Sequence, residues 1–114
     1  MEDVHKEVIP RGFVAATGTV GCTGLGGLGT GGGFNFFARR IGFAVDNMMA
    51  VEIVTANGDF VVASPDDPET KDLFWAVRGG GGAFGVVTAF KMQLHPAHTP
   101  NVYAGKKQRG RWTF

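Results

Sequence analysis

Hydrophobic residues fall into short runs that are separated by glycine-rich or polar segments, and two of these runs are typical of β-strands. Residues 51–56 (VEIVTA) are rich in β-branched side chains, and a second run, residues 60–64 (FVVAS), follows shortly after Asn57-Gly58. Asn-Gly between two such runs is a strong signal for a hairpin turn. The pattern therefore predicts an antiparallel hairpin over residues 51–64.

Two other segments have apolar residues at the three- and four-residue spacing of a helix face. The apolar positions of the first are Phe34, Phe37, Ala38 and Ile41. Those of the second, within residues 70–77, are Leu73, Phe74 and Val77. We expect Gly42 to end the first helix and the run Gly79–Gly82 to end the second. Trp75 adjoins the second apolar face and is expected in the core.

The remaining runs complete an α+β pattern. Residues 13–16 suit a short strand, and residues 83–94 suit a long one that breaks off at His95-Pro96. Residues 1–12 are polar and are expected to be a lead-in segment. Strands joined by a hairpin and a short helix favour a mainly antiparallel sheet with flanking helices over strict βαβ alternation.

Glycine changes this picture, because it accounts for 19 of the 114 residues. That is more than twice the usual share of about 7%. Nine glycines lie within residues 18–33, and four more form Gly79–Gly82. Glycine loses more backbone entropy on folding than any other residue. Clusters this dense indicate backbone that lies close to another group.

Charge and cysteine content exclude several classes of protein. Residues 1–105 carry seven basic and ten acidic side chains, so this part is no nucleic-acid binder by charge. Residues 106–114 form a basic tail, which we expect to be truncated or disordered. A single cysteine, Cys22, excludes a disulfide framework and a CxxC site. The chain shows neither a secretory signal nor a convincing membrane span, so no membrane partner is expected.

The motifs in the chain do not identify a standard nucleotide or metal site. Residues 24–29 satisfy G-x-G-x-x-G, but the preceding strand is poor, and a P-loop fails because no Gly-Lys-Ser/Thr follows. His95 and His98 resemble a metal pair without a third ligand, so no metal site is expected. Arg78 either pairs with Asp46 or Asp72 or faces solvent, and the sequence leaves these alternatives open.

The first glycine cluster still suits a backbone-lined site for an anion or a flavin. Glycines let several N–H groups approach a phosphate or a ring edge without a clash at Cβ. Four nearby hydroxyls add candidate donors: Thr17, Thr19, Thr23 and Thr30. The alternative is a tightly packed, turn-rich loop without a ligand. The Asp46-Asn47 pair is expected to cap or turn the chain, and His5 to be solvated.

Two segments taken together resemble a known family. They are TGLGGLGTGGG followed by ARRIGFAVDNMMAVEIVTANGDFVVAS, and DLFWAVRGGGGAFGVVTAFKMQLHP. In this order and spacing they resemble the FAD-linked oxidases of the vanillyl-alcohol oxidase/p-cresol methylhydroxylase (VAO/PCMH) superfamily, in the berberine bridge enzyme-like (BBE-like) branch. The resemblance covers roughly residues 10–105. It implies the second subdomain only of a PCMH-type FAD-binding domain, over residues 13–105.

The resemblance implies FAD as the cofactor and an oxidoreductase acting on a small molecule. It also implies a set of contact positions toward FAD: Thr19, Gly21, Gly24, Leu25 and Val87. The position of a flavin-linked cysteine in some relatives corresponds to Val20, so Cys22 is expected to be a bystander. The family usually has glycine where this chain has Asn35. No catalytic residue is implied within the chain.

Three hypotheses follow for function. The first is a fragment of an FAD-dependent oxidase that contributes glycine-rich flavin-binding loops and is inactive alone. The second is an inactive remnant or folding module with exposed apolar surface. The third is a Rossmann-type nucleotide binder, which requires parallel strands where residues 51–64 otherwise form an antiparallel hairpin.

Overall fold

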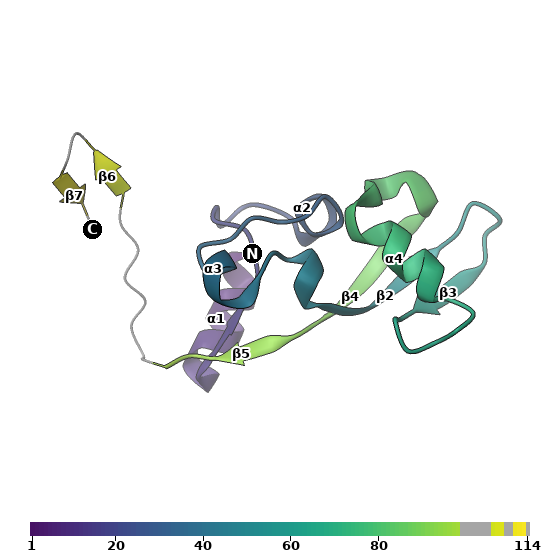
Figure 1. Ribbon diagram of the computed structural model, residues 1–114, viewed down its shortest axis with the longest axis horizontal. Helices are drawn as coiled ribbons and strands as arrows, with labels where there is room; N and C mark the ends of the chain where they lie inside the picture. The colour runs from purple at the N-terminus through teal and green to yellow at the C-terminus, as the bar shows by residue number, and fades with distance from the viewer. Residues whose placement is uncertain (99–105, 109–110, 114) are drawn as a thin grey trace.

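A computed structural model describes residues 1–98, 106–108 and 111–113. Its helices and strands alternate in an α+β order, with antiparallel pairing in every sheet (Figure 1). The helical elements are α1 (Glu2–Val8), η1 (Ile9–Arg11), α2 (Leu25–Thr30), α3 (Ala38–Ile41), η2 (Val45–Asn47), α4 (Lys71–Gly80) and η3 (Gly81–Phe84). The strands are β1 (Phe13–Ala15), β2 (Met48–Val54), β3 (Phe60–Ala63), β4 (Val86–Met92), β5 (Leu94–Pro96), β6 (Lys106–Gln108) and β7 (Arg111–Thr113).

The central sheet has the strand order β3-β2-β4, and β2 is antiparallel to both neighbours. The predicted hairpin is confirmed, because Val51 pairs with Ala63 and Val54 with Phe60. Gly58 adopts φ 88° at the turn and donates to the carbonyl of Thr55. Residues that form an antiparallel hairpin cannot provide the parallel strands of a local βαβ unit. The Rossmann-type hypothesis is therefore wrong for this segment.

A small core lies between this sheet and α4. Val51 and Ile53 alternate with exposed Glu52 along β2, so the period of two places both on the face toward α4. Phe74 and Val77 lie on one side of α4 and are buried against them, as the spacing predicts. Trp75 is 77% exposed, so its expected place in the core is wrong. It follows Phe74 by one residue, which turns it about 100° away around the helix.

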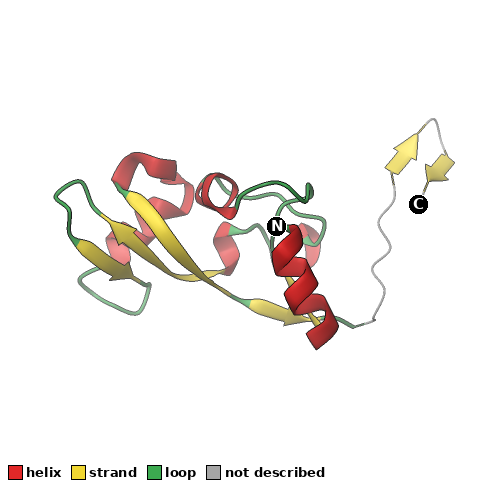
Figure 2. Ribbon diagram, turned by 180° about the vertical axis from the view of Figure 1, so that it is seen from behind, coloured by secondary structure: helices red, strands yellow, loops and turns green. Residues whose placement is uncertain are grey.

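The predicted strand over residues 83–94 is divided differently in the structure. β4 begins only at Val86, after the short helix η3, and β5 continues to Pro96 beyond Gln93. β5 pairs with β1, so one nearly continuous stretch of chain joins the two sheets (Figure 2). Pro96 lies opposite Phe13 as the last residue of β5, so the expected break at His95-Pro96 is wrong.

The N-terminal part is more ordered than the expected lead-in segment. Residues 2–8 form α1, whose Val8 is buried together with Val14 and Ala15 of β1. Part of the basic tail forms the antiparallel pair β6 and β7, and residues 99–105, 109–110 and 114 lie outside the described part. Within the described residues, no helix has the length and apolar character needed to cross a membrane.

Ile53 provides a test of this core, because it is fully buried whereas Val62, on the neighbouring strand, is 53% exposed. We expect Ile53→Ala to lower the free energy of unfolding by about 2–5 kcal/mol through lost burial and a cavity. Val62→Ala, the matched control, is expected to change it by about 0.5 kcal/mol or less. Urea unfolding followed by circular dichroism measures both, and equal losses would contradict the placement of the core.

Candidate functional site

The two glycine clusters lie next to each other in the fold. The first glycine segment, residues 17–33, leaves β1, turns, and forms α2 before it reaches Gly31–Gly33. The second glycine segment, residues 79–85, follows α4, and helical geometry breaks at Arg78 and Gly79. α2 packs against both α4 and η3, so the clusters meet across the sequence distance between them (Figure 1).

Between them lies a hollow of about 390 Å³, which we call the glycine cradle. Its lining comes from α2 on one side and from η3 and the start of β4 on the other. The lining residues are Gly26, Gly27, Thr30, Gly81, Gly82, Gly85, Val86 and Val87. The hydroxyl of Thr30 donates to the carbonyl of Gly26 within α2 (2.7 Å), and none of these lining residues is charged. The cradle therefore offers mainly backbone and apolar contacts.

Most glycines in the two segments are required by the protein itself. Some have a backbone conformation that favours glycine: Gly32, Gly33, Gly79, Gly81 and Gly85 all have φ between 60° and 143°. Others lie too close to a neighbour for a side chain: a Cβ on Gly18, Gly29 or Gly80 would come within 2.9 Å of another side chain. These positions explain part of the glycine excess by packing alone.

Four glycines have neither reason, and they gather at one place. A Cβ on Gly24, Gly26, Gly27 or Gly82 would meet nothing within 4 Å, and none of the four has a positive φ. Gly24 is the N-cap of α2, whereas Gly26 and Gly27 lie inside the helix, where glycine is less favourable than alanine by roughly 0.5–1 kcal/mol. Gly26, Gly27 and Gly82 line the cradle. At these three positions a Cβ would meet no neighbour, and the absence of side chains leaves the hollow open.

The structure divides the five predicted FAD contacts between different places. Val87 lies on β4 and lines the cradle. Thr19 and Gly21 line a second hollow of about 210 Å³ beneath α1. Gly24 is the N-cap of α2 and Leu25 its first residue, and neither lines these two hollows. Gly26, Gly27 and Gly82 also line the cradle; they belong to the two predicted glycine clusters but are not among the five predicted contacts.

The turn between β1 and α2 is fastened by the start of the chain. The amino group of Met1 donates to the carbonyls of Gly21 and Thr23 (both 3.1 Å). His5, expected to be solvated, is half-buried and is hydrogen-bonded through Nε2 to the hydroxyl of Thr17. Cys22 is exposed and has a free thiol. α1 therefore fixes the segment that carries two of the predicted contacts.

The side chain of Asn35 holds the turn that follows the first glycine segment. Its side chain is buried, donates through Nδ2 to the carbonyl of Gly42 (2.9 Å), and accepts from the N–H of Phe37 (2.8 Å). This second bond is an Asx turn, which asparagine forms readily after a glycine run. The helix that follows, α3, begins only at Ala38 and is shorter than expected. Phe34, which was expected on its apolar face, lies before the helix and is 63% exposed.

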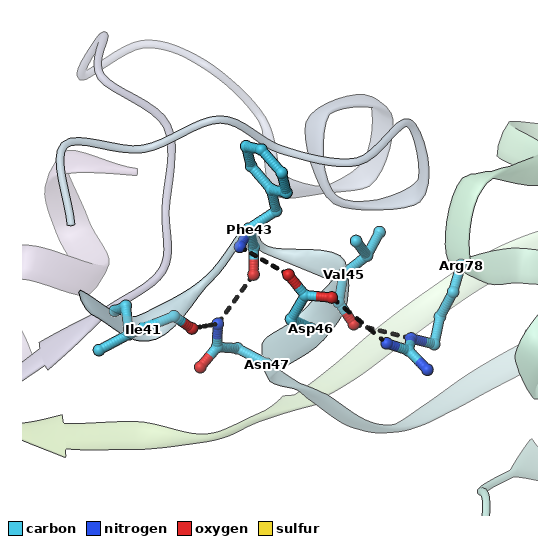
Figure 3. Close-up of polar contacts among 6 residues, drawn as sticks. All are labelled: Ile41, Phe43, Val45, Asp46, Asn47 and Arg78. Atoms are coloured by element: carbon cyan, nitrogen blue, oxygen red, sulfur yellow. Dashed lines mark hydrogen bonds and ion pairs between the residues drawn. The ribbon is translucent and has the colours of Figure 1, made fainter. Parts of the chain in front are cut away.

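The Asp46-Asn47 pair forms the predicted turn (Figure 3). Asp46 Oδ2 accepts from the N–H of Phe43 (2.8 Å). Asn47 Nδ2 donates to the carbonyls of Ile41 and Phe43 (both 2.8 Å), and its Oδ1 is hydrogen-bonded to His95 Nε2. His95 thus contacts an amide, and the described residues contain no cluster of three or more metal-ligating side chains.

Arg78 lies between this turn and the second glycine segment. Its Nε donates to the carbonyl of Val45 (2.7 Å), and its Nη2 lies 3.8 Å from Asp46 Oδ1 (Figure 3). The guanidinium carbon is 5.5 Å from the centre of the Phe74 ring. Of the two partners that the sequence offered, Asp46 is the one that Arg78 approaches.

Comparison with known proteins gives close relatives. The chain is 45% identical over 93 residues to an FAD-linked oxidoreductase of Aspergillus terreus, covering 82% of this chain and 18% of that protein. A VAO-type flavoprotein of Myceliophthora thermophila superposes with a TM-score of 0.79 at 35% identity, covering 83% of this chain and 17% of the other. BBE-like 1 of Physcomitrella patens superposes with a TM-score of 0.76 at 31% identity, covering 83% and 21%.

No family model matches the chain. The homologues are nevertheless FAD-linked oxidoreductases of VAO and BBE-like type, as the resemblance implied, and they share this α+β fold with antiparallel sheets. The chain spans about a fifth of the length of the curated relatives it matches.

Alanine substitution is expected to have opposite effects on stability at the glycines that face open space and at those in close contact with a neighbour. We expect Gly26→Ala and Gly27→Ala each to raise the free energy of unfolding by up to about 1 kcal/mol, since alanine favours the helix and its Cβ meets open space. Gly33→Ala is the contrasting variant. Its Cβ would lie 2.3 Å from that of Ala44 at φ 81°, so it should destabilise the protein.

Thermal unfolding of the three variants measures these shifts. Destabilisation by Gly26→Ala or Gly27→Ala as large as that by Gly33→Ala would show that the fold itself requires these glycines.

Proposed function

We propose that this chain forms one side of an FAD site. It corresponds to about a fifth of the length of its homologues, the FAD-linked oxidoreductases of VAO and BBE-like type. The observation that carries the proposal is the open cradle, where Gly26, Gly27 and Gly82 have no internal reason to lack a side chain. Glycine at such positions lets a ligand lie directly against the backbone.

The residues present fit such a cofactor. A hollow of about 390 Å³ is within the usual size of a ligand pocket, roughly 300–1,000 Å³. Its apolar and backbone lining suits a planar ring or a ribityl chain. In this proposal Val87 and the glycines of the cradle contact one part of FAD, and Gly24 and Leu25 lie along the neighbouring backbone. Thr19 and Gly21 contact another part at the second hollow.

When bound, FAD would supply the redox chemistry for the oxidation of a small-molecule substrate. This chain's own role is to position the cofactor and to exclude water from one of its faces. We assign no acid or base in this chain to catalysis. In the complete enzyme, the substrate site belongs to parts of the protein that this chain does not include.

A second candidate, a folding module without catalysis, has an observation in its favour. Several large apolar side chains are well exposed, among them Phe34, Phe36, Phe60 and Trp75, each at 60% or more. Exposed apolar patches mark surfaces that pack against other protein. This candidate predicts self-association without FAD binding. A monodisperse monomer by light scattering would contradict it.

FAD titration tests the main proposal. We expect the wild-type chain to bind FAD weakly, with half-saturation in the micromolar range or above, and to show no turnover. Gly27→Ala should weaken binding further, because its methyl group occupies the cradle. Val62 lines neither the cradle nor the second hollow, so Val62→Ala serves as the control.

Flavin fluorescence follows all three titrations. Tight stoichiometric binding by the wild-type chain would refute the idea that the site is shared with other parts of the enzyme. Equal affinity of Gly27→Ala and wild type would place the cofactor elsewhere.

A further inference from the structure

The backbone of Val45 is hydrogen-bonded to the first glycine segment and to Arg78, the residue that precedes the second. Its N–H donates to the carbonyl of Gly32 (3.0 Å), next to the bond from Ala44 N–H to the carbonyl of Gly33 (2.9 Å). Its carbonyl accepts from Arg78 Nε (2.7 Å), and Arg78 is followed directly by Gly79. A single residue of η2 therefore connects the end of the first glycine segment with the residue that leads into the second.

Arg78 is oriented for this bond from two sides. The ring of Phe74, itself buried, lies beneath the guanidinium, and Asp46 lies beside it. The ion pair contributes little, because its atoms are 3.8 Å apart and both side chains are partly exposed. The Nε–H bond to Val45 is shorter and is donated by a charged group, which makes it the stronger contact.

The backbone of Arg78 shows why an anchor is needed here. Arg78 has ψ 68° and Gly79 has φ 127°, so the helical hydrogen bonding of α4 is interrupted where the second glycine segment starts. Glycine-rich backbone has wide conformational freedom. A side-chain bond from the residue directly before it restricts where the segment can lie relative to α2.

We propose that Arg78 is a positioning residue that sets the width of the glycine cradle by fixing the second glycine segment, through Val45, to the first. Its consequence for FAD rests on the proposed function above. Lysine cannot replace it, because an ammonium on a flexible stem lacks the directed Nε–H of the guanidinium.

Arg40 offers a matched control within the same chain. Its Nη2 donates to the carbonyl of Pro96 (2.8 Å), so it also joins a side chain to a distant backbone carbonyl. This bond fastens β5 and contacts neither glycine segment. Comparing variants of Arg40 and Arg78 separates the general effect of losing an arginine-to-carbonyl hydrogen bond from the effect of losing the bond to Val45.

The experiment compares Arg78→Met, Arg78→Lys and Arg40→Met in the 114-residue chain. Amide hydrogen exchange by NMR is measured first, because it requires no cofactor. We expect the Val45 and Ala44 amides to exchange about tenfold faster in both Arg78 variants, while amides of β2 keep their rates. Arg40→Met should leave Val45 and Ala44 unchanged. The lysine variant also provides a milder change if Arg78→Met does not fold.

FAD titration then gives the functional consequence, with half-saturation expected about tenfold higher in the Arg78 variants and unchanged in Arg40→Met. Wild-type rates at Val45 and Ala44 in Arg78→Lys would overturn the inference, and so would equal acceleration at all amides. If the wild type binds FAD, an unchanged FAD affinity in the Arg78 variants would also overturn the inference. If the wild type binds no FAD, the proposed function fails, and the exchange rates alone decide whether Arg78 positions the segment.

Discussion

The close approach of Gly33 to Ala44 is the contact on which the arrangement of the site depends. A Cβ on Gly33 would lie 2.3 Å from that of Ala44, so only glycine permits the two backbones to meet. The approach allows the N–H groups of Ala44 and Val45 to reach the carbonyls of Gly33 and Gly32. It joins the first glycine segment to η2, and η2 leads directly into β2 at the centre of the sheet. The first glycine segment is thereby joined through η2 to the central sheet.

The glycine excess consequently has two physical origins. At positions such as Gly33 and Gly85, glycine is required by a positive φ and by close backbone contact. At Gly26 and Gly27 it weakens a helix without any internal compensation. A sequence that keeps both kinds accepts lower stability at one place, which is a common pattern at functional sites. Composition alone cannot separate the two, because the distinction lies in what surrounds each Cα.

The sequence predicted those elements whose signals are local. The hairpin around Asn57-Gly58 and the apolar face of α4 needed only a turn signal and helical spacing, and both are confirmed. α2 was missed, because its sequence LGGLGT has poor helix propensity, and α1 was missed because only its Val8 is buried. The bond from Arg78 to Val45 spans 33 residues, so no local pattern could reveal it, although Asp46 was foreseen as a partner. The site is a tertiary feature, and the sequence indicated its ingredients rather than their arrangement.

Charge sets a limit on how this cradle can hold an anionic dinucleotide. The described residues up to His98 carry seven basic and ten acidic side chains, and none of the residues that line the cradle is charged. Arg78, the basic residue that precedes the second glycine segment, donates to Val45 and lies near Asp46. Long-range attraction toward a pyrophosphate is therefore weak on this side of the site. In the proposed FAD site, affinity would come from backbone N–H groups and from apolar contact with uncharged parts of the cofactor. Because both act only at short range, the separation of the two glycine segments would matter more for FAD binding than it would in a site built on charge.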